Sequence, residues 1–132
     1  MKPTKDEVRK VFTDVRLRDR FIRALGMLID VYTLKHQDIG NCPLCPVARD
    51  AHTLMQGGEW DSECGYCPWM YFTGQDCDDY FDEWAEENDM DWYKGERTTI
   101  SFVRMHSDEQ REWAEHRLPM IRKWRKAFKS WK

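Results

Sequence analysis

The chain has 132 residues, of which 41% are hydrophobic and 34% charged, with a formal net charge of −3. These proportions indicate one folded domain and exclude a disordered chain, and no apolar run approaches the roughly 20 residues that a membrane-spanning helix requires. The N-terminal segment lacks the apolar stretch of a signal peptide, so we expect a protein that stays in a reducing cytosol.

The small net charge hides a strong separation of opposite charges along the chain. The net charge is +4 over residues 1–35, −4 over residues 36–75, −9 over residues 76–96 and +6 over residues 97–132. The protein is therefore basic toward both ends and acidic in the middle, a pattern that favours separate charged surfaces.

Helical periodicity dominates the first 35 residues. Thr4 and Glu7 have the spacing of a capping box, and apolar residues follow at intervals of three and four. The pattern predicts either one long helix or two helices with a break near Leu17–Asp19, ending at about Lys35.

Four cysteines form two Cys-x-x-Cys pairs, Cys42 with Cys45 and Cys64 with Cys67, and 18 residues separate the pairs. Two residues between cysteines allow one tight turn to direct both sulfur atoms at one ion, and two such turns give the tetrahedral four-thiolate site of structural zinc. An iron–sulfur cluster would accept the same ligands, but we favour one Zn²⁺ ion. A redox-active Cys-x-x-Cys motif opens a helix after a strand in a βαβ pattern, and neither pair has that sequence context. We therefore do not favour a redox site.

The segment between the N-terminal helices and the acidic region, residues 39–77, contains five of the seven glycines and few periodic apolar positions. We therefore expect a loop-rich insert that depends on the metal for its stability. A fifth cysteine, Cys77, is an alternative ligand that would replace one of the four. His52 is a further candidate, although a surface or core histidine is the simpler interpretation.

The cysteine block also carries a resemblance. The segments CPLC, CGYCPW and FTGQDC, followed by RLPMIRKW near the C-terminus, resemble a loose group of small uncharacterised bacteriophage proteins that share the order C-P-x-C, C-x-x-C-P and T-G-x-x-C. The resemblance implies a phage protein in the host bacterial cytoplasm, a bound metal and no assigned activity. It also implies that Cys77 belongs to the metal site.

The sequence lacks the usual catalytic signatures. It has no H-x-E with P-C-x-x-C deaminase motif, no H-E-x-x-H, no phosphate-binding P-loop and no G-x-S-x-G. Four thiolates also leave no open coordination position for a reacting water molecule. We therefore expect a protein that is not an enzyme.

An acidic helix is predicted from about Asp78 to Glu87, with Tyr80, Phe81 and Trp84 on its inward face. Its carboxylates are either a solvated face, a docking surface for the basic C-terminal helix, or an imitation of a phosphate backbone that binds a host protein. The candidate protein-binding residues, which include aromatic side chains expected to be exposed, are Asp79, Asp82, Glu83, Trp84, Glu86 and Trp92.

Residues 97–105 have a strand-like composition but are too short to assign. Ser107 and Gln110 form a second capping box, which predicts a C-terminal helix to about Ser130, kinked or interrupted at Pro119. The apolar residues of this helix form one stripe that favours packing on the N-terminal helix. Its candidate nucleic-acid-binding residues are Lys123, Lys126, Lys129 and an exposed Trp131.

Together these patterns predict a mainly α-helical single domain over residues 1–132, with a zinc-stapled, loop-rich insert like a zinc ribbon or knuckle. Its parts are an N-terminal helical part (1–38), the insert (39–77), and an acidic helix, linker and basic helix (78–132). The favoured function is a non-catalytic zinc-binding phage accessory protein that binds and modulates or inhibits a host protein. The alternative is a zinc-containing nucleic-acid-binding protein that uses the basic C-terminal helix. We expect no membrane association.

Overall fold

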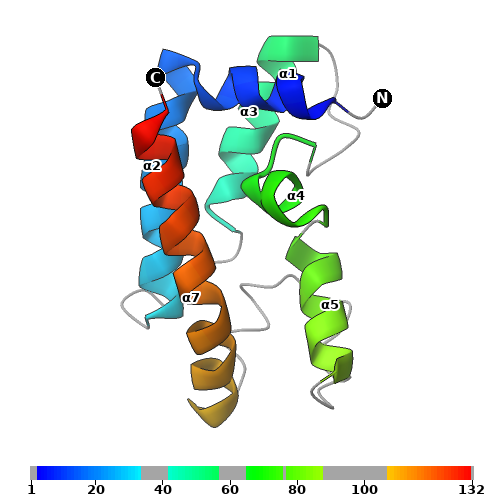
Figure 1. The fold of residues 1–132 in the computed structure, drawn as a ribbon, viewed down its shortest axis with the longest axis vertical. Helices are drawn as coiled ribbons and strands as arrows, with labels where there is room; N and C mark the ends of the chain where they lie inside the picture. Colours follow the sequence, from blue (N-terminus) through cyan, green and yellow to red (C-terminus); the bar gives the residue numbers. More distant parts are fainter. Residues whose placement is uncertain (1–2, 34–41, 57–64, 76, 88–106, 132) are drawn as a thin grey trace.

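The computed structural model describes residues 3–33, 42–56, 65–75, 77–87 and 107–131, and these are almost entirely helical (Figure 1). The predicted mainly α-helical class is therefore confirmed for the described residues, and a zinc-binding insert is not shown. Residues 97–105 lie outside them. The helices are α1 (Lys5–Phe12), α2 (Val15–Tyr32), α3 (Leu44–Gln56), α4 (Pro68–Thr73), α5 (Cys77–Glu87) and α7 (Ser107–Ser130).

The N-terminal region forms two helices, one of the two predicted arrangements. The capping box is confirmed, because the Glu7 amide donates to the Thr4 hydroxyl at 3.2 Å and the Thr4 amide donates to the Glu7 carboxylate at 3.1 Å. The predicted position of the break was wrong. It lies at Thr13 and Asp14, where the Asp14 carboxylate caps α2 by accepting from the Arg16 amide at 2.8 Å. Hydrogen bonds from Arg16 also lower the pKa of the Asp14 carboxyl below its ordinary value.

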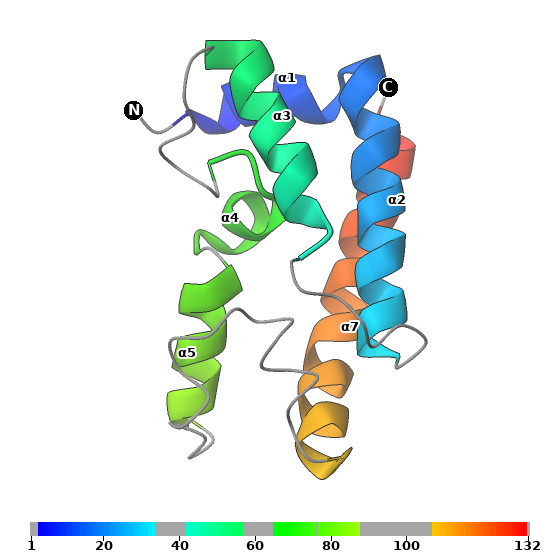
Figure 2. The same ribbon diagram turned by 180° about the vertical axis from the view of Figure 1, so that it is seen from behind.

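Helix α7 lies antiparallel to α2 and forms the main helix pair of the molecule (Figures 1 and 2). The buried side chains of Ile121, Trp124 and Phe128 form its inward stripe, so the predicted packing on the N-terminal helices is confirmed. The helix continues through Pro119 without ending, which excludes the predicted interruption.

Hydrogen bonds join α2 directly to the C-terminal end of α7. The Arg18 side chain of α2 donates from Nε to the carbonyl of Phe128 at 2.8 Å and from Nη2 to that of Lys129 at 2.9 Å. These carbonyls belong to the last turn of α7, where no further helical amides follow, so Arg18 caps that helix end. The same end is closed by Phe12, whose ring lies 4.7 Å from that of Phe128.

The segment predicted to be a loop-rich insert contains two helices, so this prediction was wrong for residues 44–56 and 68–73. Pro46 lies in the first turn of α3 and Pro68 at the first position of α4, where proline is tolerated because the amide it removes has no partner within the helix. Helix α3 buries a face of small and medium apolar residues against the core: Leu44, Val47, Ala48 and Ala51.

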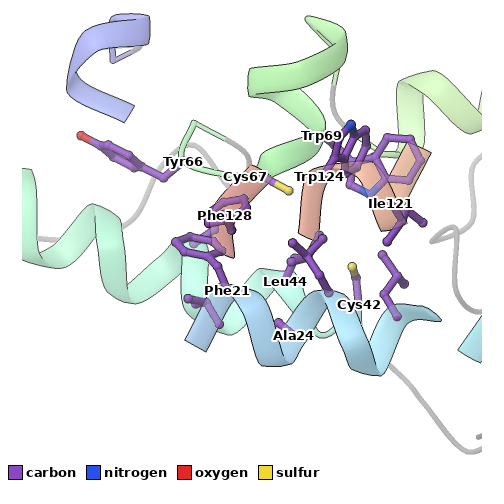
Figure 3. Close-up of a cluster of buried hydrophobic side chains, with 14 of the residues drawn as sticks. Phe21, Ala24, Cys42, Leu44, Tyr66, Cys67, Trp69, Ile121, Trp124 and Phe128 are labelled. Atoms are coloured by element: carbon purple, nitrogen blue, oxygen red, sulfur yellow. The ribbon is translucent and has the colours of Figure 1, made fainter. Parts of the chain in front are cut away.

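The core is unusually aromatic (Figure 3). Trp113 of α7 is fully buried, and its ring lies 4.9 Å from that of Trp84 and 5.2 Å from that of Phe81, both on α5. Trp69 of α4 packs edge-on against Trp124 of α7 at 5.0 Å. Rings contributed by separate helices thus join α4 and α5 to the α2–α7 pair.

Gly74 ends α4 with a left-handed backbone conformation, φ 80°, and its amide donates to the Met70 carbonyl at 2.9 Å. Replacing Gly74 with alanine is expected to lower the free energy of unfolding by about 1 kcal/mol, because a Cβ atom is unfavourable in this conformation. Urea denaturation measures the change. Gly74→Asn is the matched control and should cost less, since asparagine tolerates the left-handed region. Equal stability of the alanine variant and the wild type would contradict the assignment.

Candidate functional site

The first cysteine pair forms a turn at the start of α3. The Cys45 amide donates to the Cys42 carbonyl at 3.1 Å, and helix α3 begins between them at Leu44. Cys42 is buried and Cys45 is half-buried. The helix N-terminus favours negative charge, so this position suits thiolates, and the turn has the compact form that a Cys-x-x-Cys ligand pair requires.

Cys67 lies at the start of another helix. It is the N-cap residue of α4, its carbonyl accepts from the Tyr71 amide at 3.1 Å, and it is 3% exposed. Figure 3 shows Cys42 and Cys67 within one cluster of buried side chains. His52 is 5% exposed and packs edge-on against Tyr66 at 6.2 Å, which is the arrangement of a core histidine.

The described cysteines do not converge on one point. Across the ranges that the structure describes, no three His, Cys, Asp or Glu side chains lie close enough together to hold one metal ion. Cys42 and Cys45 would supply two of the four thiolates of the predicted site, and Cys67 is not grouped with them. Cys64 and the side chain of Cys77 lie outside the described residues. The zinc site and its iron–sulfur alternative therefore stay predictions.

The acidic helix is confirmed as α5, with Phe81 and Trp84 facing inward. The prediction of an exposed Trp84 was wrong: it is 5% exposed because its ring packs against Trp113. The side chains of Glu83, Glu86 and Glu87 are exposed, and we call these three the acidic face of α5. Asp82 is half-buried, whereas the side chain of Asp79 and all of Trp92 lie outside the described residues.

A pocket of about 230 Å³ adjoins the acidic face, between α5 and α7. Two carboxylates, Glu83 and Glu87, stand at its edge, and the Gln75 side-chain amide donates to Glu83 at 2.9 Å. Residues of both polar and aromatic character line it: Gln75, Tyr80, Glu83, Trp84, Glu87 and Arg117.

Arg117 closes this pocket from the side of α7. Its guanidinium carbon lies 4.3 Å from the centre of the Tyr80 ring and 4.8 Å from that of Trp113. Burial lowers the pKa of Arg117, while Tyr80 and Glu87 act in the opposite direction. Its Nε–H is buried and has no hydrogen-bond acceptor among the described residues. The aromatic rings thus hold a cation beside two carboxylates, an arrangement that the sequence did not reveal.

The predicted nucleic-acid-binding residues divide into two groups. Lys123, Lys126 and Lys129 are exposed along α7, as a phosphate-binding surface requires. The prediction of an exposed Trp131 was wrong. Its ring stacks on those of Phe12 at 6.1 Å and Phe72 at 6.0 Å, so little of it remains for stacking on a base.

Within the described ranges, no helix has the length and apolar character needed to cross a membrane. Comparison with known proteins finds no matching family model, no matching curated protein and no matching solved structure.

Proposed function

We propose that this protein is a non-catalytic accessory protein of a bacteriophage that acts in the host cytoplasm, where it binds and modulates or inhibits a host protein through the acidic face of α5. The observation that carries the proposal is the exposure of Glu83, Glu86 and Glu87 beside a pocket of about 230 Å³. Such a surface attracts a basic partner and increases its rate of association.

The pocket suggests how the partner is recognised. Carboxylates and aromatic rings together favour a cationic side chain, and Glu83, Glu87 and Tyr80 supply both. Arg117 already occupies the aromatic side of the pocket in this way, with its guanidinium over the Tyr80 ring. A lysine or arginine of the partner would bind between Glu83 and Glu87, with the rest of the contact made by the acidic face.

The proposal includes one zinc ion bound by Cys42, Cys45, Cys64 and Cys67, with Cys77 as the alternative ligand. The Cys42–Cys45 turn at the start of α3 supports it, as does the position of Cys67 at the start of α4. A four-thiolate zinc ion supplies stability rather than reactivity. Its part in the function would be to hold α3 and α4 against the core.

The experiment is a pull-down from nuclease-treated host lysate with three forms of the tagged protein. We expect wild type to retain a host protein in stoichiometric amount, and the triple variant Glu83→Gln, Glu86→Gln, Glu87→Gln to lose it. The matched control is Asp108→Asn, Glu112→Gln, Glu115→Gln, which neutralises three exposed acids of α7 and changes the net charge equally.

The control separates a specific surface from a general effect of charge. Binding that falls equally in both triple variants would contradict the acidic face as the site. Loss of the recovered protein when the lysate is treated with nuclease would show that nucleic acid had mediated its recovery, and the proposal would fail. A retained protein is then titrated in purified form, and its affinity should weaken as the salt concentration rises.

A further inference from the structure

A second charged site, separate from the pocket between α5 and α7, lies in the groove between α2 and α7. This groove has a volume of about 230 Å³ and is lined by Ile29 of α2 and by four cations of α7: Arg122, Arg125, Lys126 and Lys129. Arg122, Lys126 and Lys129 are exposed and Arg125 is half-buried. Within the described parts of the chain, none of the four forms an ion pair. We call this feature the cationic groove.

Arg125 is fixed in position by α2. Its Nε–H donates to the carbonyl of Ile22 at 3.1 Å. The guanidinium lies across Gly26, where a Cβ atom would stand 3.3 Å from both Nε and Nη2. Glycine inside a helix costs about 1 kcal/mol relative to alanine, and here it provides the space for the arginine. The N–H groups of Arg125 that do not bond to Ile22 remain as donors on the groove.

We propose that the cationic groove binds the phosphate backbone of duplex nucleic acid, with Arg125 as its fixed anchor and Arg122, Lys126 and Lys129 as further phosphate contacts. The inference is independent of the acidic face of α5. The first and last groove cations, Arg122 and Lys129, are seven positions apart, about 10 Å along a helix. Duplex DNA carries one phosphate per roughly 1.7 Å of its axis, so several phosphates fall within this length.

The packing of α7 favours a duplex over other anionic partners. Binding of single strands depends on aromatic side chains that stack on bases, and Trp131 is instead packed against Phe12 and Phe72. A helix that lies in a membrane interface needs a free apolar face. Ile121 and Phe128 of α7 are fully buried in the core. Contacts to the backbone alone carry no sequence information, so we expect binding without sequence preference.

The test is fluorescence anisotropy with two short duplexes of unrelated sequence, over about 50 to 200 mM salt. Wild type should bind both duplexes equally. The logarithm of its affinity should fall against the logarithm of salt concentration with a slope of about −3.6, the value for four phosphate contacts. Failure to bind either duplex at the lowest salt concentration would overturn the proposal.

A pair of double variants locates the binding. Lys126→Gln with Lys129→Gln should weaken binding and make the slope less negative by about 1.8, because two phosphate contacts are lost. The matched control is Lys5→Gln with Lys10→Gln, which removes two exposed lysines of α1 that do not line the groove. The control should bind as wild type does. An equal loss in both double variants would overturn the groove as the site.

Gly26→Ala tests the anchor without changing any charge. The added Cβ atom would stand 3.3 Å from Nε and Nη2, so the Arg125 guanidinium must shift by a few tenths of an ångström. We expect weaker binding and a salt slope that is less negative by no more than about 0.9, the value for one phosphate contact. Urea denaturation confirms that the variant is folded. Wild-type affinity in a folded Gly26→Ala protein would remove Arg125 from the proposal. Tighter binding to single strands, or to anionic vesicles with the same dependence on Lys126 and Lys129, would contradict a duplex as the ligand.

Discussion

Replacing Trp113 with alanine is expected to lower the free energy of unfolding by about 3–5 kcal/mol, the usual cost of removing a large buried aromatic side chain. Trp113 is fully buried and its ring lies within 6.4 Å of the rings of four aromatic residues on α2, α4 and α5: Tyr32, Trp69, Phe81 and Trp84. A small domain has a total stability of about 5–15 kcal/mol, so this loss removes a large part of it.

Urea denaturation at equilibrium measures the effect. Trp113→Phe keeps an aromatic ring in the site and should cost clearly less than the alanine variant. Val15→Ala serves as the surface control, because Val15 is 85% exposed and its truncation should change stability by about 0.5 kcal/mol or less. A Trp113→Ala protein as stable as the Val15→Ala protein would contradict the position of Trp113 at the centre of the core.

Replacing Cys42 with serine is expected to abolish binding of the proposed zinc ion and to unfold the region around α3. Structural zinc in small cysteine sites contributes about 10 kcal/mol or more of folding free energy. Without a metal, the change from a buried thiol to a hydroxyl costs only about 1–3 kcal/mol. The size of the effect therefore distinguishes a ligand from an ordinary buried cysteine.

The measurements are metal content of the purified protein and melting temperature with and without a chelator. Wild type should contain one zinc ion per chain, and both Cys42→Ser and Cys64→Ser should lose it. Cys77→Ser is the discriminating comparison: zinc retained in this variant supports the two Cys-x-x-Cys pairs, and zinc lost assigns Cys77 to the site. Unchanged metal content and melting temperature in Cys42→Ser would show that Cys42 is not a ligand.

The parts of the fold that follow from local patterns were predictable from the sequence. The capping box at Thr4 and the inward stripe of α5 depend on residues within two turns of one another, so their spacing is visible in the chain. Helix α3 was missed because the glycines of residues 39–77 were taken to indicate a loop-rich insert, although none of them lies within Leu44–Gln56.

The features that depend on distant residues could not be predicted in this way. Trp131 was expected to be exposed, and its packing against the core is visible only in its contacts with the distant Phe12 and Phe72. The same holds for the anchored Arg125, whose partner carbonyl at Ile22 lies 103 positions away. Gly26, within the apolar pattern of α2, was the one sequence feature that pointed to this contact. Its role became clear only from the position of α7 beside it, with the Arg125 guanidinium against Gly26.

The capping of α7 by Arg18 has a consequence for the protein during its synthesis. The two carbonyls that Arg18 binds belong to residues 110 and 111 positions later in the chain. At about 5–20 residues per second, a ribosome needs roughly 5–20 s to add that length. Until then α1 and α2 have no α7 against which to bury Phe12 and Phe21. The nascent chain therefore exposes its N-terminal aromatic residues to chaperones and to other chains for most of the time that its translation takes.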